Sequence, residues 1–293
     1  MEATFEALEW KDIVTGVSAS GDVFADARGV WRCEDGACEH RPWRGGDVGR
    51  QALPCAASND DNSAISPAGT RVVQVCEGKL VITTLATGEV VRRKLPFSEL
   101  DDLEVDESGV VTVVHEHSVA RVTAKGLQGP FALEVPKDAI TPADFASLYA
   151  ASGPWLAYTH GAYEKEVAWR ASTSAPTEVA LGGGALFNGE HMWVSLMTSG
   201  YVRMTESGPV AVAGRIGAGL PGHGLLLSVL PWGADGLIAQ YEEAALLVDR
   251  ELNTRRQLHT PNAKDDYGTI GSDPSGAWLF FVHSDGKIAV AAL

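Results

Sequence analysis

The chain has 293 residues, 45% of them hydrophobic and 21% charged, and its 23 basic and 38 acidic side chains give a formal net charge of −15. This composition is that of a folded globular protein and excludes general disorder. The acidic surplus argues against a nucleic-acid partner and against docking on an anionic membrane, because both require clustered lysine and arginine.

One pattern recurs along the chain: a small polar turn that ends in glycine, followed by apolar strands separated by short turns. The clearest copies begin at 66–69, 106–109 and 273–276. The glycines that mark successive copies are Gly21, Gly69, Gly109, Gly153, Gly189, Gly236 and Gly276. The steps between these glycines run from 36 to 48 residues. A period of about 40 residues with several short strands per unit is typical of β-propeller blades.

The repeats predict an all-β fold, a single seven-bladed β-propeller domain over residues 1–293. The last copy has only three strands before Leu293, which would leave an unpaired sheet edge. The apolar, alternating segment 4–10 precedes the first copy. We expect this N-terminal segment to join the C-terminal blade as its fourth strand and to close the ring, and a frayed N-terminal tail is the alternative.

Three stretches carry a resemblance to a known family. Residues 66–71 read Ser-Pro-Ala-Gly-Thr-Arg, residues 85–91 read Leu-Ala-Thr-Gly-Glu-Val-Val, and Asp-Pro-Ser-Gly at 273–276 repeats the first half. These stretches resemble the WD-repeat-like bacterial propeller repeats of the YVTN and TolB type. The resemblance implies a bacterial β-propeller. It implies no single function, because such families include partner-binding scaffolds, lactonases, lyases and sugar-binding proteins.

Up-and-down strands give each blade two ends. The loops after the second and fourth strands share one end, called here the loop end, and the turns after the first and third strands share the other, called the turn end. Acidic residues and histidines gather at the expected loop end, where few basic residues interrupt them. The residues expected to bind a ligand there are Asp60, Asp61, Asp101, Asp102, His160, Asp265, Asp266 and His283. As a group they are expected to attract a basic partner by their field or to hold Ca²⁺.

A metal site is a second interpretation of the same end. His115 and His117 place two imidazoles on one side of an extended segment, and His160 falls at the equivalent loop of the next blade. With a carboxylate, such a set binds Zn²⁺ or Mn²⁺ at about 2.0–2.2 Å. The alternative is that each histidine simply ends a strand and is hydrogen-bonded or solvated. No cofactor is assured, and no nucleophile elbow, phosphate loop or dinucleotide motif is present.

The four cysteines lie between residues 33 and 76. A hairpin around Gly36 would place Cys33 opposite Cys38, and Cys55 and Cys76 both fall at the loop end. Their even number and clustering favour the disulfides Cys33–Cys38 and Cys55–Cys76 and a periplasmic or secreted location. Reduced thiols in a cytoplasmic protein are the alternative, and the spacings suit a four-cysteine zinc site poorly.

The eight tryptophans are spread along the chain at nearly one per repeat, so we expect them to fill the space between blades. Trp43 and Trp232, which each follow a proline, are the best candidates for an exposed sugar-binding ring.

The leading interpretation is a monomeric, non-catalytic propeller that binds a protein or small-molecule ligand at its acidic loop end. The first alternative is a metal-dependent lyase or hydrolase that uses His115, His117 and His160 with a carboxylate of the same end. The second alternative is a carbohydrate-binding propeller. No membrane insertion is expected, since no run approaches the roughly 18 unbroken apolar residues of a spanning helix.

Overall fold

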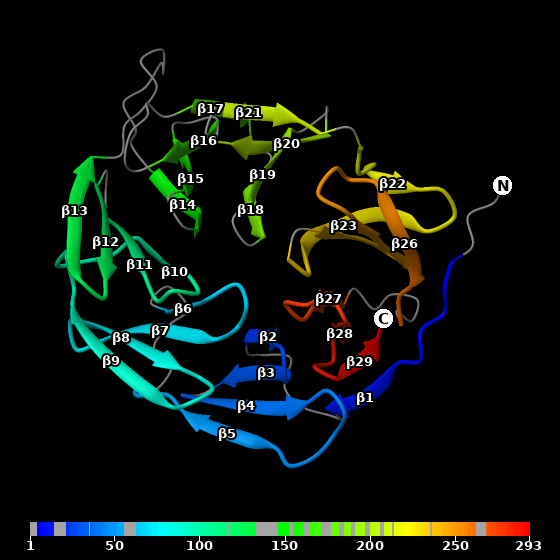
Figure 1. Ribbon diagram of the computed structural model, residues 1–293, viewed down its shortest axis with the longest axis horizontal. Coiled ribbons are helices and arrows are strands. Elements are labelled where there is room, and N and C mark those ends of the chain that lie inside the picture. Colours follow the sequence, from blue (N-terminus) through cyan, green and yellow to red (C-terminus); the bar gives the residue numbers. More distant parts are fainter. Residues whose placement is uncertain are drawn as a thin grey trace. The chain divides into compact units, whose positions relative to one another are not determined.

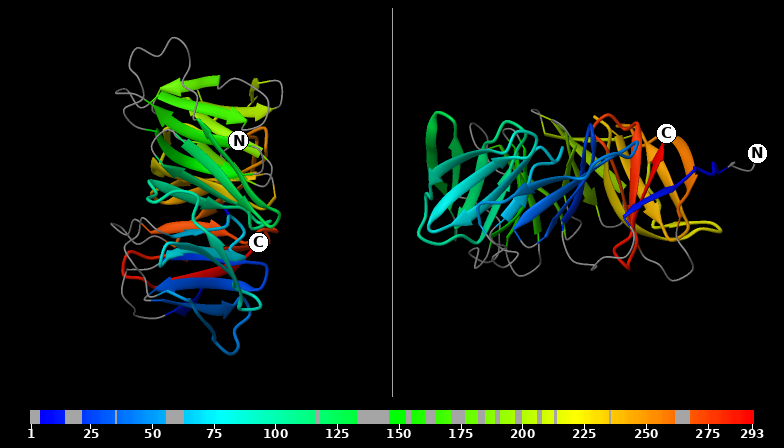
Figure 2. Two further views of the ribbon diagram at one scale, coloured as in Figure 1. Left: turned by 90° about the vertical axis from the view of Figure 1, so that its left-hand side faces the viewer. Right: turned by 90° about the horizontal axis from the view of Figure 1, so that it is seen from below.

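A computed structural model describes most of the chain, which divides into two compact units. The described residues are 5–14, 22–34, 36–55, 63–115, 118–132, 146–152, 155–160, 165–170, 177–181, 185–188, 191–196, 200–205, 208–212, 214–234, 236–261 and 268–293, and between 133 and 211 only Arg203 and Val210 have described side chains. Unit 1 comprises Met1–Ala52 and Val212–Leu293, and unit 2 comprises Leu53–Ala211. The described strands pair antiparallel throughout the sheets of both units (Figures 1 and 2).

Unit 1 contains three sheets, ordered β2-β3-β4-β5, β22-β23-β24-β25-β26 and β1-β29-β28-β27. Their strands are β1 (Lys11–Val14), β2 (Asp22–Asp26), β3 (Gly29–Glu34), β4 (Ala37–Pro42), β5 (Gly49–Ala52), β22 (Gly219–Leu220), β23 (Gly224–Trp232), β24 (Gly236–Tyr241), β25 (Ala244–Val248), β26 (Thr254–His259), β27 (Thr269–Ser272), β28 (Trp278–Val282) and β29 (Ile288–Ala292).

Unit 2 contains four sheets, ordered β6-β7-β8-β9, β10-β11-β12-β13, β14-β15-β16-β17 and β18-β19-β20-β21. Their strands are β6 (Ser63–Ile65), β7 (Arg71–Cys76), β8 (Lys79–Thr84), β9 (Glu89–Lys94), β10 (Asp102–Val105), β11 (Val111–His115), β12 (Ser118–Thr123), β13 (Gly126–Ala132), β14 (Ala146–Ser152), β15 (Trp155–His160), β16 (Lys165–Arg170), β17 (Thr177–Leu181), β18 (Ala185–Asn188), β19 (His191–Leu196), β20 (Gly200–Thr205) and β21 (Gly208–Ala211).

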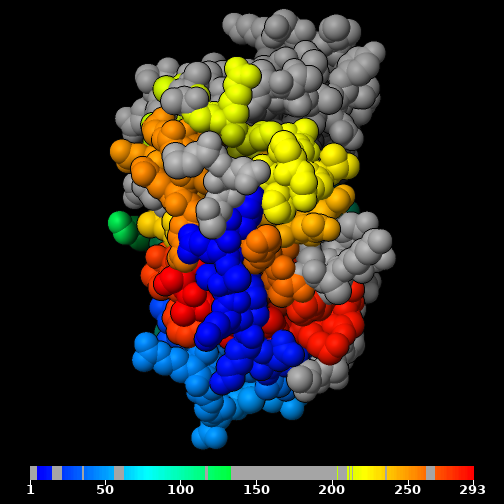
Figure 3. Space-filling view, turned by 90° about the vertical axis from the view of Figure 1, so that its right-hand side faces the viewer, coloured from blue at the N-terminus to red at the C-terminus, as the bar shows by residue number. Residues whose placement is uncertain are grey.

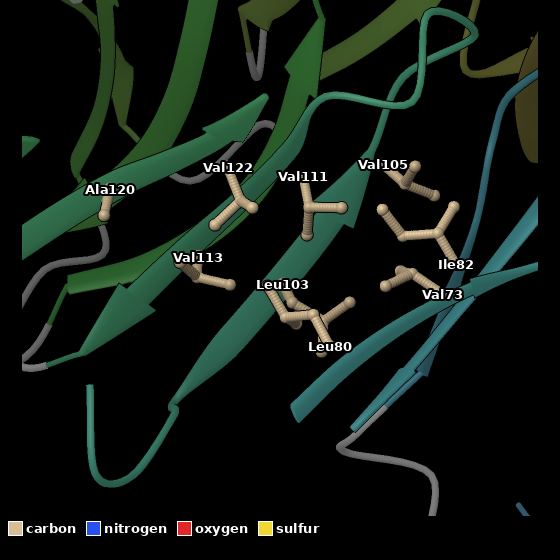
Figure 4. Close-up of a cluster of buried hydrophobic side chains, with 9 residues drawn as sticks. All are labelled: Val73, Leu80, Ile82, Leu103, Val105, Val111, Val113, Ala120 and Val122. Atoms are coloured by element: carbon tan, nitrogen blue, oxygen red, sulfur yellow. The ribbon is translucent and has the colours of Figure 1, made fainter. Parts of the chain in front are cut away.

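Alternation along the strands places successive side chains on opposite faces of each sheet, as the β10–β13 sheet shows. Leu103, Val113 and Ala120 stand directly opposite one another on β10, β11 and β12, and all three are buried. They pack against Val73 and Leu80 of the β6–β9 sheet (Figure 4). Because side chains alternate with a period of two, the intervening row of the same strands faces the other side of the sheet.

The N-terminal segment runs over the surface of unit 1 (Figure 3). The strand predicted over 4–10 to complete the last sheet is wrong in its residues, because β1 at Lys11–Val14 pairs with β29 instead. Glu6 lies alongside β26, where its N–H donates to the carbonyl of Gln257 at 2.8 Å and its carbonyl accepts from the N–H of His259 at 3.0 Å. Leu8 and Trp10 pack on the hydrophobic core beneath. The backbone of this segment therefore forms hydrogen bonds with β26, in a neighbouring sheet, before β1 begins.

The turns follow the predicted chemistry at most positions. Gly36, Gly88 and Gly286 adopt positive φ in tight turns between strands, as the dipeptides Asp35-Gly36, Thr87-Gly88 and Asp285-Gly286 predict. Gly21 is an exception, because it precedes β2 and lies outside the described residues. The turn between the first and second strands of that sheet is instead formed by Ala27 and Arg28. No helix within the described ranges is long and apolar enough to cross a membrane.

Candidate functional site

The loop-end residues predicted to bind a ligand are described only in part. Asp60, Asp61, His117, Asp265 and Asp266 lie outside the described residues. His160 is the last residue of β15, and only its backbone is described. Asp101, Asp102, His115 and His283 have described side chains.

Asp101 and His115 meet at the loop end of the β10–β13 sheet. The N–H of Asp101 donates to the carbonyl of Val114 at 2.9 Å, which places Asp101 beside the end of β11. Its Oδ2 lies 3.8 Å from Nδ1 of His115. The imidazole also packs on the ring of Phe97 with centroids 5.7 Å apart. One predicted ligand-binding carboxylate and one predicted metal ligand are therefore neighbours.

His283 occupies the loop end of the last sheet in unit 1. Its N–H donates to the carbonyl of Lys287 at 2.8 Å, and its ring packs edge-on against Phe281. Asp285 and Lys287 form an ion pair at 2.5 Å in the same hairpin. Among the described residues, no group of three or more histidine, cysteine, aspartate or glutamate side chains is placed to hold a metal ion. The metal set of His115, His117 and His160 stays a prediction, because the last two side chains are not described.

A second polar centre, which the sequence interpretation did not find, lies at the turn end of the β2–β5 sheet. Asp26 ends β2 and is only 6% exposed. Its carboxylate accepts hydrogen bonds from Nε and Nη2 of Arg28 at 3.1 and 2.8 Å and from Nε1 of Trp31 at 3.1 Å. The backbone N–H groups of Arg28 and Gly29 donate to the other oxygen at 2.7 and 3.0 Å. The ring nitrogen Nε2 of His40 lies 3.5 Å from that oxygen.

These contacts decide the charge of Asp26. Burial alone would raise the pKa of its carboxyl, but the polar contacts from His40, Trp31 and Arg28 outweigh burial and hold the pKa well below its usual range. Asp26 is therefore ionised at neutral pH and forms a fixed charge pair with Arg28. Gly29 permits this close packing, because a Cβ there would collide with the carbonyl of Arg41.

A pocket of about 330 Å³ opens beside this charge pair. Its lining residues are Ala27, Arg28, Pro42, Trp43, Arg44 and Trp278. They come from two turns of the β2–β5 sheet and from the start of β28 in the neighbouring sheet, all within unit 1. The rings of Trp43 and Trp278 stack with centroids 5.5 Å apart and an interplanar angle of 9°. We call this cavity the arginine–tryptophan pocket.

The tryptophans with described side chains are mostly structural, as predicted. Trp43 is 5% exposed, and its Nε1 donates to the backbone carbonyl of Asp26 at 3.2 Å, so the prediction of an exposed sugar-binding ring at Trp43 is wrong. Trp232 packs on a core cluster and donates from Nε1 to the carbonyl of Gly276 at 3.2 Å. The ring at each position is held by a hydrogen bond and by packing.

Both predicted disulfides are present, Cys33–Cys38 and Cys55–Cys76, and no free cysteine occurs among the described residues. Cys33 and Cys38 are directly opposite on β3 and β4, with Cα atoms 4.0 Å apart. Cys55 and Cys76 join the segment before β6 to the end of β7, with Cα atoms 6.1 Å apart.

Solved structures share the fold of this chain at low sequence identity. The β-propeller domain of Cps50 (Swd1) from Myceliophteria thermophila matches with a TM-score of 0.60 and 16% identity, covering 97% of this chain and 100% of that chain. YCF48 bound to D1 peptide matches with a TM-score of 0.59 and 12% identity, covering 99% of this chain and 100% of that chain. BBS1N in complex with ARL6DN matches with a TM-score of 0.57 and 10% identity, covering 98% of each chain.

These similarities establish the β-propeller fold and support the predicted resemblance at the level of fold. No protein-family model matches the sequence, and no curated protein matches it.

Proposed function

We propose that this chain is a non-catalytic β-propeller that binds a partner protein at its acidic loop end. The observation that carries the proposal is the fold, which the chain shares with propellers solved with a bound peptide, YCF48 with D1 peptide, and with a bound protein, BBS1N with ARL6DN. Rigid sheets that hold variable loops are a common framework for such binding. A shared fold does not identify the partner, so we infer the partner's chemistry from the net charge of the chain.

We further propose that the two units form one seven-bladed ring over residues 1–293. Three sheets in unit 1 and four in unit 2 support this number among the described strands. The pairing of β1 with β29 supports closure of the ring by the N-terminal strand, because it removes the free edge that the last sheet would otherwise have.

The partner segment is basic in this proposal. The net charge of the chain is −15, and a field of this sign draws cationic segments and repels anionic ones. Exposed carboxylates at the loop end include Glu77 between β7 and β8 and Asp101 before β10 in unit 2, and Glu243 between β24 and β25 in unit 1. These positions lie on loops that the adjoining strands hold in place.

Two glutamates at opposite ends of β8 provide a matched test of the binding end. Glu77 precedes β8 at the loop end, Glu89 follows it at the turn end, and both are exposed. The probe is a ten-residue lysine–serine peptide, acetylated and amidated, titrated by fluorescence anisotropy at low salt. We expect Glu77→Gln to weaken binding about threefold and Glu89→Gln to leave it unchanged, because only the first removes a charge from the binding end.

The same titration near physiological ionic strength supplies the control, since screening weakens contacts between exposed charges. Equal effects of the two variants would show that the peptide senses only net charge and would overturn the assignment to the loop end. Binding that is insensitive to salt would overturn the electrostatic basis of the proposal.

A further inference from the structure

We propose that the arginine–tryptophan pocket is a second binding site, which takes a single carboxylate of a peptide together with the apolar group next to it. The site lies at the turn end of two sheets of unit 1 and binds an anion. It is therefore independent of the loop end and of the basic partner proposed for that end.

Arg28 is already held in place before any ligand binds. Its guanidinium forms a two-pronged contact with the carboxylate of Asp26, while its side chain is still 52% exposed. Nε and Nη2 face Asp26, so the hydrogens of Nη1 remain to contact a ligand. Asp26 is itself fixed by Trp31 and by backbone N–H groups. A cation held this way loses little freedom when an anion binds, which favours affinity.

Arg44 adds a second positive charge to the pocket. This residue follows Trp43 in the exposed turn between β4 and β5 and lines the pocket. No described residue forms a hydrogen bond or ion pair with its side chain. Lys11 is also near this turn, with Nζ 4.0 Å from the position that a Cβ on Gly45 would take. Asp26 neutralises Arg28, so Arg44 supplies the uncompensated positive charge of the lining.

The net charge of the chain and the size of the pocket limit the class of ligand. The net charge of −15 disfavours polyanions, which would meet long-range repulsion, so the ligand carries one anionic group. A volume of about 330 Å³ is at the lower end of small-ligand pockets and accommodates a side chain with its neighbour rather than a nucleotide. Arginine forks match the planar carboxylate group.

Part of the pocket wall is apolar. Pro42 and the partly exposed ring of Trp278 line the same pocket as the two arginines. An apolar side chain adjacent to the carboxylate would cover these surfaces when the carboxylate contacts Arg28 and Arg44. Trp43 is too deeply buried to present the open ring face that a sugar would need, so this wall favours a peptide over a carbohydrate.

The carboxylate has two sources in peptides, a C-terminus and an acidic side chain, and a set of dipeptides separates them. The probes are acetyl-Leu-Leu with a free C-terminus, acetyl-Leu-Glu-amide and the neutral acetyl-Leu-Gln-amide. Binding is followed by the indole N–H resonances of Trp43 and Trp278, assigned with the Trp278→Phe variant. We expect at least one carboxylate probe to bind with a dissociation constant on the order of 1 mM and the neutral probe to bind at least fivefold more weakly.

Substitutions then locate the site. We expect Arg44→Gln to weaken binding of the carboxylate probe about fivefold, and Arg28→Lys, which keeps the charge beside Asp26 but loses the planar fork, to weaken it by a similar factor. Arg50→Gln is the matched control, because Arg50 is an exposed arginine of the same sheet that does not line the pocket. Its effect should stay below twofold.

Several outcomes would overturn the inference. Equal binding of the neutral and anionic probes would remove the role of the arginines. Tighter binding of inorganic phosphate than of either carboxylate probe would assign the pocket to another ligand. Equal losses in Arg44→Gln and Arg50→Gln would show a non-specific effect of surface charge. Because Arg44 is exposed and does not contact Asp26, its variant remains informative even where changes at Arg28 disturb folding.

Discussion

Two carboxylates that are shielded from solvent, one in each unit, have pKa values shifted in opposite directions. Asp26 in unit 1 accepts hydrogen bonds from Arg28, Trp31 and Gly29, and its pKa is held well below the usual range. Glu104 on β10 in unit 2 is partly buried, and no described residue donates a hydrogen bond to its carboxyl. Burial, together with the nearby charge of Asp102, raises the pKa of Glu104 to about 8.

The difference shows that donors in direct contact, and not depth alone, decide whether a buried acid stays charged. A donor that stands opposite an acid in the strand register does not necessarily form a hydrogen bond with it. Glu104, Thr112 and Arg121 stand opposite one another on β10, β11 and β12, yet no ion pair joins the two charged groups among the described contacts. Nε and Nη2 of Arg121 have no hydrogen-bond partner, and burial lowers the pKa of this arginine. Asp26 differs because its donors come from its own turn and the next strand.

The largest expected effect is at Asp26. Replacing Asp26 with Asn removes the charge that holds Arg28 and one of the two strong acceptors, so we expect the free energy of unfolding to fall by about 3 kcal/mol. Chemical denaturation monitored by tryptophan fluorescence measures this loss. Glu39→Gln is the control, because Glu39 makes a single long contact of 3.4 Å with Arg41 and should cost far less. A loss at Asp26 no larger than at Glu39 would contradict the proposed role of the donors.

The pH dependence of Asp26 follows from the direction of its shift. The folded pKa lies below the unfolded value, so the stabilisation by Asp26 is fully present above about pH 4 and is lost as the pH falls below it. Wild-type stability should therefore decrease on acidification below pH 4 more steeply than that of Asp26→Asn. Parallel curves for the two proteins would contradict the lowered pKa.

Glu104 should show the opposite dependence, with a somewhat smaller effect. Its folded pKa of about 8 exceeds the ordinary value of 4.5, so the folded state binds an extra proton between these pH values and stability falls as the pH rises. Glu104→Gln cannot ionise and should be more stable than the wild type at pH 9 by on the order of 2 kcal/mol. The advantage should shrink toward pH 5. A constant difference across this range would show that the carboxyl is not titrating, and the exposed Glu89→Gln provides the baseline.

The smallest expected effect is at Glu6. Its carboxylate forms an ion pair with Arg256 at 2.6 Å, and this hydrogen bond lowers the pKa of Glu6, but the pair is exposed to solvent. We expect Glu6→Gln to lower the thermal midpoint only slightly, and less so at high salt. A large fall would show that the N-terminal segment depends on this pair more than on the packing of Leu8 and Trp10.

Local sequence patterns predicted the strands and several turns, but they could not predict contacts between segments that are distant in the chain. The repeat period identified the copies at Gly69, Gly109 and Gly276 because turn chemistry and alternation are properties of neighbouring residues. Cys33 and Cys38 were paired correctly for the same reason, since the hairpin between them is short. The N-terminal strand was predicted too early, because 4–10 and 11–14 are both consistent with a strand and only the contacts of Glu6 with β26 separate them.

The arginine–tryptophan pocket could not be read from periodicity. It joins a turn at Arg28, a turn at Trp43 and the start of β28 at Trp278, and the last of these is over two hundred residues away in the chain. The prediction also placed the first turn at Gly21, which hid the role of Asp26. The short spacing of Asp26, Arg28 and Trp31 could have indicated this centre. A carboxylate that is followed within a few residues by hydrogen-bond donors can accept their hydrogen bonds and stabilise the turn between them.

The pairing of β1 with β29 also constrains the order of events during synthesis. The partner of β1 begins at Ile288, so most of the residues between the two strands must be translated before that sheet can be completed. Until then Ile13 and Val14 lack part of the apolar surroundings they have in the native protein. The protein is therefore expected to be more open to chaperones and proteases until β29 has been made and has paired with β1.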